Sequence, residues 1–127
     1  MRNRNYMLIG IGAFTLSLAA LLGAYGSHGV QGAVDAQTWA AYEVAVDYQF
    51  YHGLGIIVAG MLAERAPKSR WVAYSGWILL FGVIAFSGGI YATTFGAPDV
   101  IGALTPIGGV GLIVGWLSLA FGVVRAE

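Results

Sequence analysis

The sequence predicts an all-α protein that is embedded in a membrane as a bundle of four transmembrane helices. Of its 127 residues, 58% are hydrophobic and 9% are charged, whereas about a quarter of the residues in a soluble domain are charged. Four apolar stretches are each long enough to cross the hydrocarbon core of a bilayer, which takes roughly 20 helical residues. The basic residues all fall at the two termini or between the second and third stretches, which would lie on the same side of the membrane. We therefore expect a single transmembrane domain over residues 1–127, with both termini in the cytoplasm.

Short connections join the expected spans, and local signals support their boundaries. Thr105-Pro106 is typical of a helix N-cap followed by proline at the first helical position, where the missing N–H costs nothing. Arg2 and Arg4 before the first apolar run would also suit a secretory signal peptide, but this run exceeds the usual apolar core of about 7–15 residues. We therefore expect it to remain a span. The four spans cover about residues 6–26, 38–63, 71–95 and 105–124.

The distribution of charge predicts the orientation. Two connections, which hold Asp35 and Asp99, contain no Lys or Arg. Cytoplasmic segments of membrane proteins carry an excess of Lys and Arg, so these two connections should face outward. The basic residues, which should then lie inside, are Arg2, Arg4, Arg65, Lys68, Arg70 and Arg125.

Several classes of function receive no support from the composition. Cysteine is absent and the formal net charge is zero, so we expect neither a thiol-based site nor a nucleic-acid partner. Standard catalytic and cofactor motifs are missing as well, so we expect no enzyme, no metal and no cofactor. Haem ligation by His28 and His52 is conceivable, but their different expected depths argue against it.

Polar side chains in the outer half of the bundle form a candidate site. Asp47 and His52 are expected roughly 5 Å and 12 Å inside the outer boundary, where an ionisable group should face protein or water. At roughly 100° per residue, Glu43 and Asp47 point toward the outer headgroups while His52 points into the bundle. The candidate polar pocket, open to the outside, consists of His28, Asp47, Gln49, His52, Ser87, Tyr91 and Thr105. The other interpretation, which we favour, is a hydrogen-bond network that fixes the register of the helices.

Small residues at four-residue spacing indicate close helix packing. Within the chain this is the simpler interpretation, and a dimerisation face is the alternative. The expected packing positions are Gly55, Ala59, Gly88, Gly111 and Gly115.

Four segments carry a resemblance to a known family. The run Gly23-Ala24-Tyr25-Gly26-Ser27-His28-Gly29 resembles a signature of the small bacterial inner-membrane proteins called domain of unknown function 423. Three further stretches match in the same order, and they are residues 46–54, 86–91 and 102–109. Ser27 in the first run and Gly53 in the second are small departures from the usual alanines. The resemblance implies a four-span protein of the bacterial inner membrane without an established activity, and it assigns no catalytic residue.

Three functions remain open at this stage. The first, which we favour, is a non-catalytic membrane component or accessory subunit that packs against other membrane proteins or against copies of itself. The second is a small transporter or channel that uses Asp47, Gln49 and His52. The third is a membrane enzyme, or a lipid- or quinone-binding protein, whose outward pocket includes His28 and His52, and catalysis ranks last among these functions. In each case the lipid bilayer is the immediate surrounding.

Overall fold

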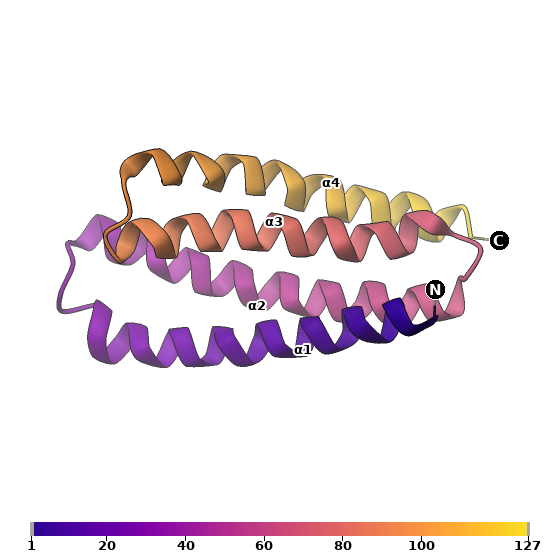
Figure 1. Ribbon diagram of the computed structural model, residues 1–127, viewed down its shortest axis with the longest axis horizontal. Coiled ribbons are helices and arrows are strands. Elements are labelled where there is room, and N and C mark those ends of the chain that lie inside the picture. The colour runs from indigo at the N-terminus through magenta and orange to yellow at the C-terminus, as the bar shows by residue number, and fades with distance from the viewer. Residues whose placement is uncertain (1, 127) are drawn as a thin grey trace.

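The computed structural model describes residues 2–126, and the chain over this range is helical without any strand. The expectation of an all-α fold is thus confirmed. The side chain of Arg2 lies outside the described part. The elements, shown in Figure 1, are α1 (Arg2–Tyr25), the π-helical turn η1 (Gly26–Val30), α2 (Ala36–Arg65), α3 (Arg70–Thr94), the 3₁₀ turn η2 (Asp99–Ala103) and α4 (Leu104–Val124).

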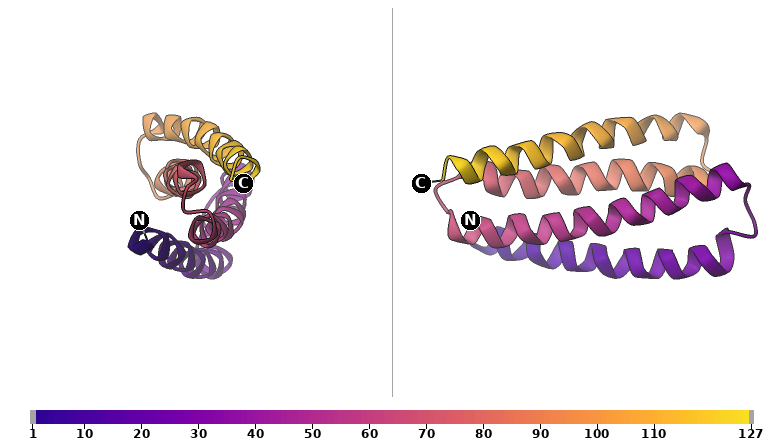
Figure 2. Two further views of the ribbon diagram at one scale, coloured as in Figure 1. Left: turned by 90° about the vertical axis from the view of Figure 1, so that its right-hand side faces the viewer. Right: turned by 180° about the vertical axis from the view of Figure 1, so that it is seen from behind.

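The four long helices alternate in direction, and helices that follow one another in the sequence pack side by side. The largest contacts join α1 to α2, α2 to α3 and α3 to α4. Seen from the end, α1 and α4 lie on opposite sides of the α2–α3 pair (Figure 2). Both chain ends lie at the same end of the molecule (Figure 1), while η1 and η2 lie at the other.

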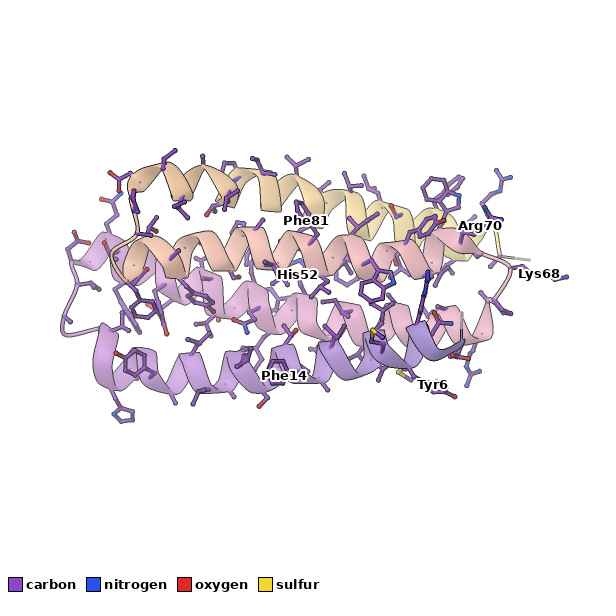
Figure 3. The ribbon with its side chains drawn as sticks, viewed as in Figure 1. Tyr6, Phe14, His52, Lys68, Arg70 and Phe81 are labelled. Carbon is purple, nitrogen blue, oxygen red and sulfur yellow. The ribbon has the colours of Figure 1, made fainter. Side chains whose placement is uncertain are left out.

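Apolar side chains fill the interior and also cover the exterior. The main core cluster takes residues from all four helices, and it consists of Leu8, Ile56, Leu79, Val83 and Leu112. On the outside, Phe14 is 63% exposed and Phe81 is 57% exposed, and both are labelled in Figure 3. So large an apolar exterior suits a bilayer rather than water.

Within the described part of the chain, three helical segments are long and apolar enough to cross a membrane, namely Arg4–Val30, Arg70–Thr94 and Asp99–Val124. Helix α2 has 30 residues, which is ample length. It falls outside this group because Asp47, Gln49 and His52 lower its mean hydropathy. Since α2 packs between α1 and α3, Gln49 and His52 are buried by its neighbours.

Several of the expected packing positions lie where helices approach closely. A Cβ added at Gly55 would come within 2.8 Å of the Trp116 ring, and one at Gly115 within 2.7 Å of Leu79. Ala59 is fully buried, and a Cβ at Gly111 would lie 3.4 Å from the Cα of Gly82.

At Gly88 the structure differs from the expectation. A Cβ added there would meet no atom within 4 Å, because the residue borders a cavity instead of a helix. The tightest approach between α3 and α4 lies elsewhere, at Gly108. A Cβ on Gly108 would lie 2.6 Å from the carbonyl oxygen of Gly82.

Candidate functional site

A hydrogen-bonded network joins the first three helices in the half of the bundle near η1. Gln49 of α2 donates from Nε2 to the carbonyl oxygen of Thr15 in α1, at 2.9 Å. Its Oε1 accepts a hydrogen bond of 2.6 Å from the hydroxyl of Tyr91 in α3. Ser87, also in α3, donates to the carbonyl oxygen of Ala45 at 2.7 Å. The amide of Gln49 thus bridges α1 and α3.

A cavity of about 230 Å³ lies over this network, between α1 and α3. Its floor includes Gln49, Ser87 and Tyr91, but their polar atoms bond mainly to one another and to the main chain, so the open lining is largely apolar. Ile84, which also lines the cavity, is 62% exposed, so the cavity reaches the outer surface of the bundle. The remaining lining residues are Thr15, Leu18, Leu22, Leu80, Val83 and Gly88.

His52 faces a different part of the bundle. Its side chain is buried, and its Nδ1 lies 2.6 Å from the carbonyl oxygen of Tyr48. Since a carbonyl can only accept, Nδ1 carries the hydrogen in the neutral ring. The ring centroid lies 5.4 Å from that of Tyr48 and 6.0 Å from that of Trp116 in α4. Figure 3 places His52 midway along the bundle, where it packs among aromatic rings outside the cavity.

The remaining predicted residues lie outside the cavity too. His28 is exposed on η1, because the π-helical turn carries it out from the bundle. Asp47 is exposed and lines a shallow groove with Glu43 and Ser27. Thr105 bonds to the carbonyl oxygen of Phe86 at 3.3 Å and so ties α4 to α3. Of the predicted pocket, the structure brings together Gln49, Ser87 and Tyr91.

Two contributors escaped the sequence reasoning. One is the backbone carbonyl of Thr15. Every residue has such a carbonyl, so the only sign in the sequence is a polar residue within an apolar span. The other is Tyr42, which is buried and donates a 2.5 Å hydrogen bond to the carbonyl oxygen of Leu22. Its ring lies against Gly26, where a Cβ would come within 2.5 Å of it. Position 26 in the first motif therefore needs glycine.

A metal centre has no support from the described residues. Within residues 2–126, no group of three or more His, Asp or Glu side chains comes together in a way that could hold a metal ion.

Comparison with protein families identifies the chain. Residues 22–109 match the profile of a family described as "Protein of unknown function (DUF423)". This range covers more than half of the chain and contains the four motif segments. The protein belongs to the DUF423 family. The resemblance noted in the sequence is thereby confirmed.

Similar proteins in several bacteria are named as membrane proteins. A UPF0382 membrane protein of Staphylococcus saprophyticus is 40% identical over 116 residues, which cover 91% of this chain and 94% of the relative. The UPF0382 membrane protein YwdK of Bacillus subtilis is 33% identical over 115 residues, covering 91% and 94%. A relative in Haemophilus influenzae is 31% identical over 127 residues, covering 100% and 98%. No solved structure matches the chain. This DUF423 member is therefore a helical membrane protein from a family without an assigned function.

Proposed function

We propose that all four long helices cross the bacterial inner membrane, with both termini in the cytoplasm. Helix α2 has the length to span, and its polar side chains Gln49 and His52 turn toward neighbouring helices rather than lipid. Lys68 and Arg70 lie at the same end as the termini (Figure 3), as an excess of basic residues on the cytoplasmic side requires. The cavity between α1 and α3 then lies in the outer half of the membrane.

Within this topology, the protein acts without catalysis and holds the apolar chain of a membrane amphiphile, acyl or isoprenoid, in that cavity. The observation that carries this proposal is a largely apolar cavity whose lining comes mainly from the facing sides of α1 and α3. Leu18 and Ile84 at its edges are exposed, so an adjoining lipid chain has direct access. A flexible apolar chain gains by filling such a space, because an empty cavity forfeits dispersion contacts.

The polar floor has a structural part in this account. Gln49 is hydrogen-bonded to both α1 and α3, and a hydrogen bond from Ser87 joins α3 to α2. These bonds hold the walls of the cavity apart at a set distance. Transport is less well supported, because His52 and Asp47 face separate surroundings instead of lining one path with Gln49.

The test is to fill the cavity with a side chain. At Gly88 an added side chain enters open space, so Gly88→Leu should occupy part of the cavity without disturbing the helices. Gly10 is exposed on α1 and is equally open around its Cβ, which makes Gly10→Leu the matched control. The probes are a phosphatidylcholine with a photoactivatable acyl chain and a photoactivatable isoprenoid quinone. We expect labelling of residues near Leu18 and Ile84, reduced more than fivefold by Gly88→Leu and unchanged by Gly10→Leu.

The two probes distinguish the sources of the chain. Labelling by the phospholipid assigns the cavity to acyl chains, and preferential labelling by the quinone assigns it to isoprenoids. If neither probe labels the cavity walls, or if both variants lower the labelling equally, the proposal is wrong.

A role as an accessory subunit is a second candidate. The observation that favours it is the serial packing of the helices, which leaves α1 and α4 on opposite sides of the molecule (Figure 2). Each of these helices keeps a broad apolar surface, such as that around Leu117 and Ile113 of α4. Mild extraction from native membranes, followed by sizing and identification of companions, tests this role. Migration as a lone monomer would contradict it.

A further inference from the structure

A second cavity lies at the opposite end of the molecule, where α3 begins and α4 ends. Its volume is about 490 Å³. The connection between α2 and α3 forms one wall, and the last turn of α4 with the residues after it forms the other. The lining residues are Lys68, Ser69, Arg70, Trp71, Phe121, Arg125 and Ala126.

Aromatic contacts build the wall of this cavity and hold one of its cations. The guanidinium of Arg125 lies 5.4 Å above the centre of the Phe121 ring, a cation–π arrangement. The Phe121 ring in turn packs edge-on against Trp71, with centroids 5.5 Å apart and planes at 88°. Ser69 donates to the carbonyl oxygen of Gly122 at 3.2 Å. The start of α3 and the end of α4 are therefore joined, and Arg125 is positioned before any ligand arrives.

The charge of the lining is one-sided. Three of its residues, Lys68, Arg70 and Arg125, are cationic, and no carboxylate is among the described lining residues. Like charges gathered around one space repel one another, so an anion that enters the cavity relieves this repulsion. Arg side chains also bind phosphate oxygens in a forked geometry.

The surroundings of the cavity point to a lipid as the source of the anion. Trp71 is 49% exposed, and Trp is enriched at the boundary between membrane and water. Phe121 and Val124 also present apolar surface beside the cavity. A ligand with a phosphate head and acyl chains would thus place its head among the cations and its chains along α3 and α4.

We propose that this cavity binds the phosphate-bearing headgroup of an anionic phospholipid. Basic pockets between transmembrane helices on the cytoplasmic side suit such headgroups. The volume and the three cations favour a headgroup with two phosphates, as in cardiolipin, over a single phosphate. This proposal rests on the proposed topology, which puts this end of the molecule in the cytoplasm, but it does not depend on the α1–α3 cavity at the other end.

The experiment compares three charge-neutralising variants, two at the cavity and one control, by native mass spectrometry. The protein is released from micelles that contain phosphatidylcholine, phosphatidylglycerol or cardiolipin, and the bound lipids are counted at several concentrations. Arg70→Gln/Arg125→Gln removes two cations from the cavity. Arg4→Gln/Arg65→Gln removes two exposed cations that do not line the cavity, and it is the matched control. Lys68→Gln/Arg70→Gln serves as a second test variant that leaves the Arg125–Phe121 contact intact.

We expect cardiolipin to bind most tightly and phosphatidylcholine least. Since the cavity variants remove cations that would contact the headgroup directly and the control variant removes none of these, the two cavity variants should bind cardiolipin about tenfold more weakly than the control variant. An equal loss of cardiolipin affinity in the cavity and control variants would show that only the net charge matters, and it would contradict the proposed binding site. Displacement of the lipid by inorganic phosphate at similar concentration would assign the cavity to a soluble anion and overturn the lipid assignment.

Discussion

Gln49 uses both ends of its side-chain amide inside the bundle. It donates to the main chain of α1 through Thr15 and accepts from the hydroxyl of Tyr91 in α3. Hydrogen bonds between transmembrane helices contribute about 0.6 kcal/mol each on average. A residue that joins three helices through two such bonds should nevertheless affect stability more than that average, because its loss leaves the buried Tyr91 hydroxyl without its acceptor.

This network gives the first prediction. Tyr91→Phe should lower the free energy of unfolding by about 0.6 kcal/mol, whereas Gln49→Leu should lower it by about 1–3 kcal/mol, because it leaves the Tyr91 hydroxyl without its acceptor. The double variant should cost less than the sum of the single ones. Unfolding by sodium dodecyl sulfate in mixed micelles measures all three. Strict additivity would mean that the two side chains do not interact.

His52 gives a second prediction at this scale. The ring packs against Tyr48 and Trp116 and bonds to a carbonyl one turn away in its own helix. His52→Phe keeps an aromatic ring in place, so we expect the stability to change by less than about 1 kcal/mol. Photolabelling of the α1–α3 cavity should remain unchanged because His52 lies outside it. Loss of labelling in a stable His52→Phe protein would place His52 in the ligand site and contradict this arrangement.

Single residues could be predicted from the sequence where the angle around one helix decides their direction. The outward direction of Asp47 and the burial of His52 both follow from the period of α2. His28 was beyond this reasoning, because it follows α1 in a π-helical turn whose winding differs from that of an α-helix. The hydrogen bond from Gln49 to Thr15 depends on how α1 and α2 are aligned along their axes. The periodicity of a single helix gives no information about that alignment.

At the scale of helices, close contacts with the main chain set the distance between neighbouring helices. Gly108 of α4 faces the carbonyl of Gly82 in α3 so closely that a methyl group cannot fit between them. On the other face of α3, Gly88 leaves a space open. The same residue type thus has opposite effects, a close approach in one place and a cavity in the other. Sequence spacing indicates that small residues matter, but the register between α3 and α4 decides which of them make contact.

The third prediction compares two glycines. Gly108→Ala should destabilise the protein by about 1–3 kcal/mol, because the methyl group forces α3 and α4 apart. Gly88→Ala should be neutral or slightly stabilising, since alanine favours the helix and meets no neighbour. Unfolding in mixed micelles distinguishes them. Equal costs at the two positions would contradict the observed packing of α3 and α4.

Asp35 at the start of α2 gives a fourth prediction, which concerns pH. The backbone N–H of Thr38 donates to its carboxylate at 2.7 Å and, with further hydrogen bonds, holds the pKa of Asp35 below its ordinary value of 3.8. The bond therefore stabilises the helix start fully above the unfolded pKa, and this contribution disappears as the pH falls through the lower pKa of the folded state.

Hydrogen exchange at the Thr38 amide measures this effect. We expect Asp35→Ala to accelerate exchange at neutral pH and Asp35→Asn, which can still cap the helix, to accelerate it less. Unchanged exchange in Asp35→Ala would show that the cap does not protect the helix start.

At the scale of the whole molecule, the serial packing of four helices separates two regions. An apolar cavity with a polar floor lies between α1 and α3 near η1, and a basic cavity lies at the other end between α3 and α4. The helical nature of the chain and the clustering of basic residues could be predicted from composition and charge. The positions of the cavities could not be predicted, because both depend on which helices pack against each other. The sequence pattern of the single helices does not show which of them are neighbours.

The membrane topology is the central claim, and cysteine accessibility tests it most directly. The natural sequence contains no cysteine, so single cysteines at Gly32, Lys68 and Val100 can be labelled with a membrane-impermeant maleimide in intact spheroplasts. Val100 is 74% exposed, and a side chain at Gly32 meets no neighbour. Four spans with cytoplasmic termini predict labelling at positions 32 and 100 from outside, and at position 68 only after lysis. Labelling of position 68 from outside, or protection of position 32 until lysis, would contradict the proposed topology.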